Sequence, residues 1–239
     1  MRRLFPFAFF LLMVSSLHAQ SLDWGLRAGL LYGGPVPTEI NADSSEGKPL
    51  VGPSAALWGS WQISEKWSLR AELGYAMKGA NYEQIIRNDT NIVLELIPNV
   101  FDTLPSFYVA FVEGSMKLHY LELPVFLQFE SLPGLDVNLG LNPAVLLGGS
   151  DAGEARVQIG EGGLFEDTTT VFENLPEMQR FDLGLMAGAT YQFGFGLQLE
   201  IRGYRSLRGL YRKGFLDEQG LKGVRMYHTH GYFGVGWRF

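Results

Sequence analysis

The sequence of 239 residues contains no cysteine. This absence excludes a disulfide-stapled scaffold, a zinc–thiolate centre and a lipid-modified N-terminal cysteine. Long apolar runs are also scarce, because no stretch beyond the N-terminal region approaches the roughly 20 apolar residues of a transmembrane helix. Lipid cannot satisfy open backbone groups, so a chain of this kind enters a membrane only as a closed β-barrel.

Basic residues are fewer than acidic ones: 19 Lys and Arg stand against 25 Asp and Glu, which gives a net charge of −6. An acidic chain lacks the electrostatic footprint that nucleic acid recognises, so we expect no nucleic-acid partner. The motifs of phosphate-binding loops, HExxH metalloproteases and GxSxG hydrolases are missing too. We therefore predict a non-enzymatic protein with no catalytic residues, no cofactor and no metal site.

Residues 1–19 have the pattern of a secretory signal peptide. Two arginines precede an apolar run over residues 4–14, and a plausible cleavage point follows Ala19. The run is too short to span a bilayer, and a short membrane anchor is the alternative interpretation. We expect residues 20–239 to form one outer-membrane β-barrel domain.

The rest of the chain alternates between apolar and polar residues with the period of two that a half-buried strand shows. One face of the last segment carries Phe233, Val235, Trp237 and Phe239. Eight alternating segments lie at residues 22–30, 57–64, 67–78, 120–130, 135–142, 181–192, 197–206 and 227–239. Their lengths suit the roughly 9–11 residues that a tilted membrane strand needs.

The connections between these segments alternate in length. Tight turns are expected near Glu65, at 131–134 and at Gly194. The long connections are expected at about 33–50, 81–115, 150–178 and 211–225. Short turns at one rim and long loops at the other are typical of outer-membrane barrels. The fold class that we predict is all-β: an eight-stranded antiparallel up-and-down transmembrane β-barrel with short periplasmic turns and long extracellular loops.

Three observations indicate that the apolar faces meet lipid rather than a soluble interior. The charges of the eight segments fall on the polar faces, as expected if the apolar faces meet lipid, where Arg or Lys costs about 2–4 kcal/mol at the bilayer midplane. A soluble interior would exclude charge as well, so the glycines and tryptophans decide between the two. Many glycines share those faces, as a narrow lumen requires. An aromatic girdle at the short-turn rim is predicted from Trp24, Trp61, Trp67 and Trp237. The alternative is a secreted soluble barrel of the lipocalin type.

Eight strands leave an interior that side chains just fill. Buried charges need partners of opposite sign, and both signs are present on the inward faces. We predict a lumen charge network in which Glu200 and Arg202 pair with Arg238 and Asp182 and hold the barrel rigid. The alternative interpretation is a narrow channel, with these residues along an ion or proton path.

A rigid barrel displays its function in its loops. Residues 81–115 contain strand-like runs and are expected to extend the barrel as a hairpin, or alternatively to form an apolar lid or partner site. Residues 150–178 are acidic, which suits a solvated loop or, alternatively, a binding site for divalent cations. We predict that the extracellular loops bind a surface partner or an envelope component.

A second functional hypothesis is an outer-membrane lipid hydrolase. His228 and His230 are both expected to face inward near the long-loop rim, with His230 opposite Ser206. A serine beside a histidine is the arrangement of acyl-ester hydrolysis, although no orienting acid is evident. Two histidines alone are weak evidence for a metal.

A family resemblance is carried by four parts of the sequence: AELGYAMKGA at 71–80, YLELPV at 120–125, LQLEIRGY at 197–204 and the glycine–aromatic C-terminal strand. In these the chain resembles the PorT-like family of small outer-membrane β-barrels. The resemblance implies an eight-stranded barrel in outer-membrane lipid, without enzymatic activity. It also implies insertion by the barrel-assembly machinery, with the terminal aromatic Phe239, and Trp237 beside it, as the assembly signal.

Overall fold

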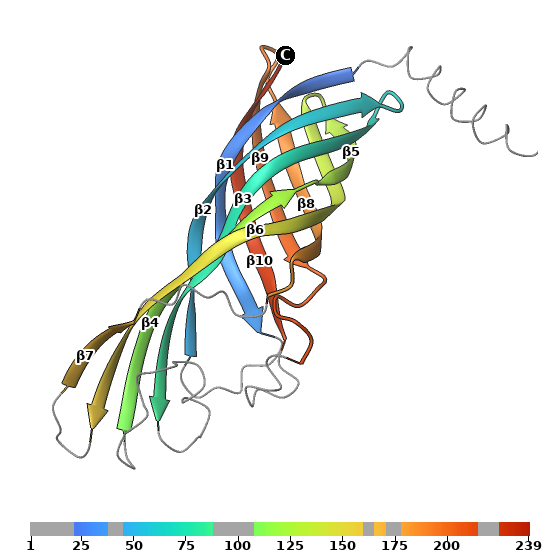
Figure 1. The fold of residues 1–239 in the computed structure, drawn as a ribbon. Helices are drawn as coiled ribbons and strands as arrows, with labels where there is room; N and C mark the ends of the chain where they lie inside the picture. The colour runs from blue at the N-terminus through green and yellow to red at the C-terminus, as the bar shows by residue number, and fades with distance from the viewer. Residues whose placement is uncertain (1–21, 38–44, 88–107, 160–164, 171–177, 215–224) are drawn as a thin grey trace, which may run out of the picture.

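The computed structural model describes residues 22–37, 45–87, 108–159, 165–170, 178–214 and 225–239. The predicted signal peptide lies outside these residues. In the described part of the chain, every strand belongs to one antiparallel sheet (Figure 1). The strands are β1 (Leu22–Pro37), β2 (Ser45–Gln62), β3 (Trp67–Arg87), β4 (Tyr108–Glu122), β5 (Val125–Leu132), β6 (Leu135–Ile159), β7 (Phe165–Thr170), β8 (Phe181–Gln192), β9 (Leu197–Ser206) and β10 (Met226–Arg238). None of the described residues form a helix long and apolar enough to cross a membrane.

The sheet closes on itself because the first strand pairs with the last. The register runs from Gly25 opposite Arg238 to Pro37 opposite Met226. Each remaining wall strand pairs with its neighbour along the chain, and β4 and β5 together occupy one position between β3 and β6. β7 pairs only with the far end of β6 and stands outside the ring. Among the described residues the ring therefore has eight antiparallel positions, which confirms the predicted up-and-down barrel.

A proline divides the segment that the alternation presents as one strand over 120–130. Pro124 has no N–H to donate, so β4 ends at Glu122 and β5 begins at Val125. The wall stays bonded across this break. The Glu72 N–H donates to the Pro124 carbonyl at 2.9 Å, and the Leu123 N–H donates to the Pro143 carbonyl at 2.9 Å.

The strands run farther than the sequence pattern predicts on the long-loop side. β3 and β4 pair as far as Arg87 opposite Val109, which confirms the hairpin expected within 81–115; residues 88–107 lie outside the described part. The expected loop over 150–178 is wrong at its start, because β6 continues to Ile159 and pairs with both β4 and β7. This segment is a strand because neighbouring strands pair with it, since the acidic sequence alone has no strong strand pattern. The result is a sheet extension that projects beyond the ring (Figure 1).

The tight turns lie at the opposite rim, beside the C-terminus (Figure 1). Gly134 adopts a φ of 79° in the β5–β6 turn, a conformation that favours glycine. The β8–β9 turn lies at Gly194 as expected, and Gly196 in this turn adopts a φ of 101°.

The side chains alternate between the outside and the inside of the ring, as predicted. Outward leucines such as Leu139 are 64% exposed, whereas Arg70 and Glu72 on the inward face are 1% and 2% exposed. A soluble protein would not present a continuous apolar outer surface of this kind. The apolar face is therefore the outer face of the barrel.

The lipid-facing surface supplies a test of this orientation. Leu141 is exposed at mid-height on β6, and Leu132 is exposed at the short-turn rim. We expect Leu141→Arg to lower the free energy of folding into lipid vesicles by about 2–4 kcal/mol and Leu132→Arg to change it by about 0–1 kcal/mol. Reversible urea unfolding in vesicles measures both. Equal costs for the two variants would contradict the assigned membrane depth.

Candidate functional site

The centre of the barrel is a cluster of buried ions around Glu72. This carboxylate accepts a hydrogen bond from Arg27 Nε at 2.6 Å and forms an ion pair with Arg70, whose Nε lies 2.8 Å away. Arg202 donates to it twice, through Nη1 at 2.9 Å and Nη2 at 2.7 Å. Glu200 accepts a hydrogen bond from Arg70 at 2.7 Å and forms an ion pair with Arg202, with 2.8 Å between the charged atoms. Three arginines and two glutamates therefore join β1, β3 and β9 across the lumen, with one bidentate contact of the strong kind.

Aromatic rings cover the outer faces of these guanidinium groups. Arg70 lies 4.3 Å from the Trp58 ring centroid, and Arg202 lies 4.5 Å from that of Phe126. Arg27 lies 4.7 Å from the Tyr232 ring. Such cation–π contacts are strongest where water is excluded. The arginines are thus sandwiched between carboxylates and rings.

Glycines in the wall make room for these large side chains. A Cβ atom built on Gly25 would lie 2.5 Å from the Trp58 ring, and one built on Gly188 would lie 2.9 Å from the Arg202 side chain. Both distances are shorter than packed carbon atoms allow. This supports the sequence argument that the inward glycines serve a narrow, filled lumen.

A second buried cluster lies nearer the long-loop rim, around Lys78. Its Nζ lies 2.7 Å from Glu122 and 3.9 Å from Asp182, and 4.0 Å from the Tyr204 ring centroid. Tyr204 donates to Asp182 at 2.5 Å. Among the described residues, the buried ions of the two clusters are Arg27, Arg70, Lys78, Arg202, Glu72, Glu122, Asp182 and Glu200. Four positive and four negative charges therefore cancel in the lumen.

Glu200, Arg202 and Asp182 are buried and ion-paired in the lumen, but the pairings predicted for Glu200 and Arg202 with Arg238 and Asp182 do not form. Glu200 and Arg202 pair with each other and with the Glu72 cluster, whereas Asp182 belongs to the Lys78 cluster. The expected pairing with Arg238 is wrong. That residue lies at the short-turn rim and pairs with Asp23 at 3.5 Å. Glu200 lies opposite Gly234, four residues farther from the end of β10, which explains the separation.

Glu72, Arg27 and Arg70 were placed on the correct face by the alternation but not singled out. These side chains meet because they lie at the same level along the barrel axis. The alternation of apolar and polar residues gives the face of a strand but not the level. The one available signal is that two basic residues flank Glu72 in sequence within the same segment, Arg70 and Lys78, on the same side of the strand.

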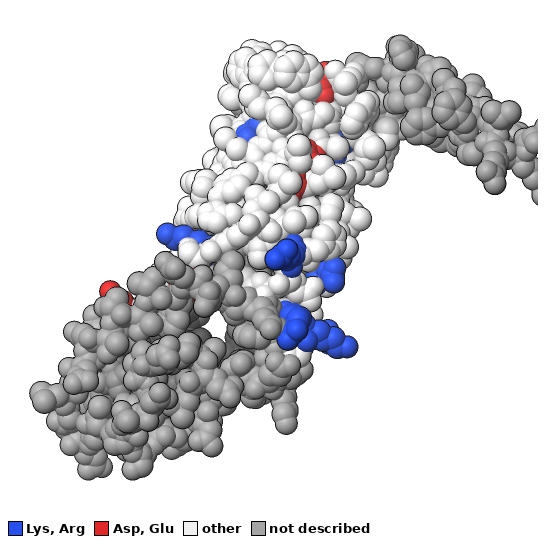
Figure 2. All heavy atoms as spheres, viewed as in Figure 1, with Lys and Arg blue, Asp and Glu red and all other residues white. Residues whose placement is uncertain are grey.

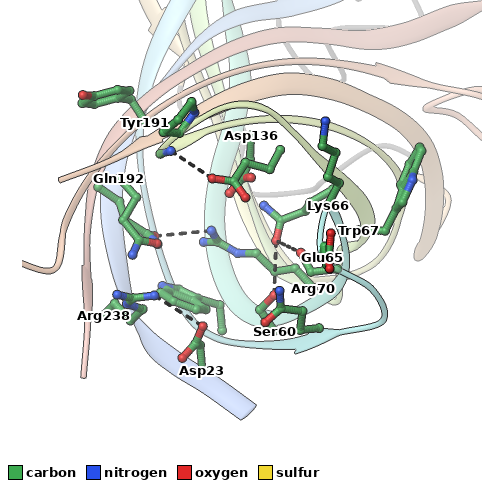
Figure 3. Close-up of a pocket in the computed structure, with 18 of the residues that line it drawn as sticks. Asp23, Ser60, Glu65, Lys66, Trp67, Arg70, Asp136, Tyr191, Gln192 and Arg238 are labelled. Atoms are coloured by element: carbon green, nitrogen blue, oxygen red, sulfur yellow. Dashed lines mark hydrogen bonds and ion pairs between the residues drawn. The ribbon is translucent and has the colours of Figure 1, made fainter. Parts of the chain in front are cut away.

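A polar cavity of about 520 Å³ opens at the short-turn rim (Figure 3). Its lining includes Glu65 and Lys66 of the β2–β3 turn, Asp136, and the Asp23–Arg238 pair. Trp58 and Arg70 also line it, so the cavity ends on the Glu72 cluster. The periplasmic half of the barrel is a vestibule, and the ion cluster is its floor.

The residues of the hydrolase hypothesis do not meet as a catalytic pair. His230 lies opposite Tyr204 in the register, not opposite Ser206 as expected. The Ser206 hydroxyl donates to Asp182 instead. His228 receives or donates a hydrogen bond at 3.2 Å with Tyr120. Among the described residues, no group of three or more His, Asp or Glu is arranged to hold a metal ion.

The tryptophans proposed as a girdle lie at the strand ends beside the short turns. Trp24 stacks on Phe239 with ring centroids 4.5 Å apart, and Trp67 lies 4.9 Å from Phe129. The sequence prediction missed part of this aromatic rim, because Phe193 and Phe195 belong to the β8–β9 turn. The Phe239 N–H donates to the Trp24 carbonyl at 3.0 Å, which ties the last residue to the first strand.

Comparisons with known proteins match the chain to one family model and to several solved structures. A family model described as the outer membrane protein beta-barrel domain matches residues 18–212. Neisserial surface protein A matches at 12% identity and a TM-score of 0.42, over 92% of this chain and 99% of that one. Ail of Yersinia pestis, in complex with the heparin analogue sucrose octasulfate, matches at 11% identity and 0.42, over 92% and 99%. OprG from Pseudomonas aeruginosa matches at 10% identity and 0.42, over 92% and 97%. A search of curated protein sequences gives no match.

The central carboxylate is the most informative position to change. Glu72→Gln keeps the shape of the side chain but leaves Arg27, Arg70 and Arg202 with only Glu200 as a charged partner. Removing one member of a buried ion cluster costs about 3–5 kcal/mol, so we expect a loss of that size in urea unfolding in vesicles. Glu65→Gln, in the exposed β2–β3 turn, is the matched control and should change little. Equal stability of the two variants would show that the cluster does not hold the barrel together.

Proposed function

The chain belongs to the outer membrane protein beta-barrel domain family, and on that premise we propose that it is a closed, non-enzymatic barrel whose extracellular sheet extension binds a positively charged surface partner. Its place is the outer membrane, as the family indicates. The proposal has two parts, a sealed lumen and a displayed binding surface.

The sealed lumen is supported by the two ion clusters. Glu72 and Glu200 have fully buried side chains, and aromatic rings occupy the space on the other side of the arginines. An ion crossing the lumen would have to displace charges that are already neutralised by their neighbours. The interior therefore favours a rigid scaffold over the alternative of a narrow channel.

The lipid hydrolase is the weaker alternative. The Ser206 hydroxyl is engaged with Asp182, and His230 faces Tyr204 across the β9–β10 pair. A serine nucleophile needs a base within hydrogen-bond reach. Neither histidine is placed in that role by the described contacts, which favours a non-enzymatic function.

The binding surface rests on one observation, a row of aligned acids on the extension. Glu83 on β3 lies directly opposite Glu113 on β4, which lies directly opposite Glu154 on β6. All three fall on the outward side, as the continuation of the lipid-facing rows. Like charges opposite one another destabilise a sheet. Lys48 on β2 offsets part of this cost by pairing with Glu83. A positively charged partner would offset the rest, and for that reason we assign the partner its charge.

The base of the extension is firmly packed. Tyr82, on the inner side of β3, donates to Asp151 on β6 at 2.7 Å. Tyr82 also packs against the buried cluster of Met116, Leu118 and Leu210. A sheet held in this way presents its acids at fixed spacing, which lowers the entropic cost of binding.

Three further assignments belong to the same proposal. We take residues 1–19 as a signal peptide on the strength of their charged and apolar regions. We assign the protein to the PorT-like branch of the family on the motifs at 71–80 and 197–204. We propose Phe239 and Trp237 as the signal for the barrel-assembly machinery, because Phe239 is exposed at the end of the closing strand.

The partner surface is tested by site-specific crosslinking in intact cells. A photo-crosslinking residue at the exposed position Ala152, next to the acid row, should capture a discrete partner. The same probe at Gln62, on the periplasmic side, is the control. Changing Glu83, Glu113 and Glu154 to Gln should reduce the Ala152 crosslink several-fold, because the attraction of opposite charges is lost. An unchanged crosslink in the triple variant would contradict the proposal.

A further inference from the structure

Exposed basic residues gather at the long-loop rim beside β8, β9 and β10. They lie in three segments that are adjacent in space, since Tyr211 bridges to Met178 and the Leu210 N–H donates to the Met226 carbonyl at 2.8 Å. The residues are Arg180, Arg205, Arg208, Arg212, Lys213 and Arg225. Figure 2 shows basic side chains gathered at this end of the barrel wall.

On the described strands and turns that carry Arg180, Arg205 and Arg208, no acidic residue is exposed. Within the described residues 178–214 and 225–239, the acids are Asp182 and Glu200, and both are buried in the lumen. The opposite side of the rim is different, because Lys48 there pairs with Glu83. The basic patch is therefore a local feature of the β8–β10 side.

Arg205 sets the level of the patch relative to the membrane. It occupies the lipid-facing side of β9, after Leu199, Ile201 and Gly203. Its neighbour across the β8–β9 pair is the exposed Leu185. A cation facing lipid at the midplane costs about 2–4 kcal/mol, and the cost falls to about 0–1 kcal/mol near the interface. Arg205 therefore marks the outer membrane–water boundary.

The surroundings of the patch are apolar on the membrane side and cationic on the outer side. Phe181 and Leu207 are exposed large apolar residues. Arg208 lies 5.4 Å from the Phe181 ring centroid, and Arg205 lies 5.9 Å from that of Tyr227. This order, hydrocarbon contacts below and guanidinium groups above, matches the order of acyl chains and headgroup in a lipid.

We propose that the Arg180–Arg205–Arg208 surface binds the phosphate groups of an outer-leaflet glycolipid. Guanidinium groups match phosphate oxygens in charge and geometry. The distribution of acids agrees with a phosphate-bearing surface at this level. Glu113 lies eight residues beyond the lipid-facing Leu121 on β4, or about 26 Å along the strand, so the acid row stands clear of the headgroups. This surface differs from the extension that the proposed function uses.

The test uses the purified full chain folded in detergent micelles. Native mass spectrometry measures how much diphosphoryl lipid A the protein retains as the lipid concentration rises. The arginines at 180, 205 and 208 are changed together to Gln, and Lys117→Gln, an exposed basic residue on the opposite side of the rim, is the matched control. We expect the triple variant to weaken lipid binding at least about tenfold, since each basic residue near an anionic surface contributes to binding. The control should bind as the unmodified protein does.

Two further ligands identify what is recognised. Lipid A without its phosphates should bind as weakly as the diphosphoryl lipid binds to the triple variant, because the acyl contacts alone remain. Inorganic pyrophosphate should compete only weakly. Heat-modifiable migration on gels confirms that each variant is folded. Retention of the diphosphoryl lipid by a folded triple variant, equal binding of the dephosphorylated lipid, or pyrophosphate binding as tight as lipid binding would each overturn the proposal.

Discussion

The constraint on which the rest of the structure depends is that charges inside an eight-stranded barrel must neutralise one another. Side chains fill the lumen around the two clusters and exclude water there, so each buried ion needs a partner of opposite sign. Glu72 meets this need for three arginines from two other strands and its own, and Glu200 completes the cluster. The wall follows from this, because the inward glycines leave the space that Trp58 and Arg202 fill. The ion clusters in the lumen therefore determine where the wall strands carry glycine.

The charges also differ along the barrel axis. The cluster near the periplasmic vestibule has one excess positive charge, and the cluster around Lys78 has one excess negative charge. The outer surface also carries charges of opposite sign at different heights. Arginines lie at the long-loop rim beside β8–β10, and aligned glutamates lie farther out on the extension. Both surfaces of the proposals lie on the long-loop side, and the ion clusters join the strands that carry them.

Alternation was sufficient to predict the ring, the orientation of its faces and the hairpin of β3 and β4, because lipid enforces a period of two on every wall strand. Alternation could not predict which side chains are in contact across the lumen. Arg202 and Glu72 are far apart in the chain, and the stagger of the strands decides whether they meet. Arg238 is an example: it lies on the predicted inward face, but at the short-turn rim, too far along the barrel axis to pair with Glu200. β6 beyond Ser150 was missed for a related reason: its acidic, glycine-containing sequence becomes a strand only because β4 pairs with it.

The most direct test of the central claim is the conductance of the purified barrel in planar lipid bilayers. Because the two clusters fill and neutralise the lumen, the unmodified protein should insert without stepwise ionic conductance. Removing the cluster side chains Arg70 and Arg202 together, by substitution with Ala, should create a leak. Reproducible conductance steps in the unmodified protein, with a size that changes in Arg202→Gln, would contradict the account of a sealed interior.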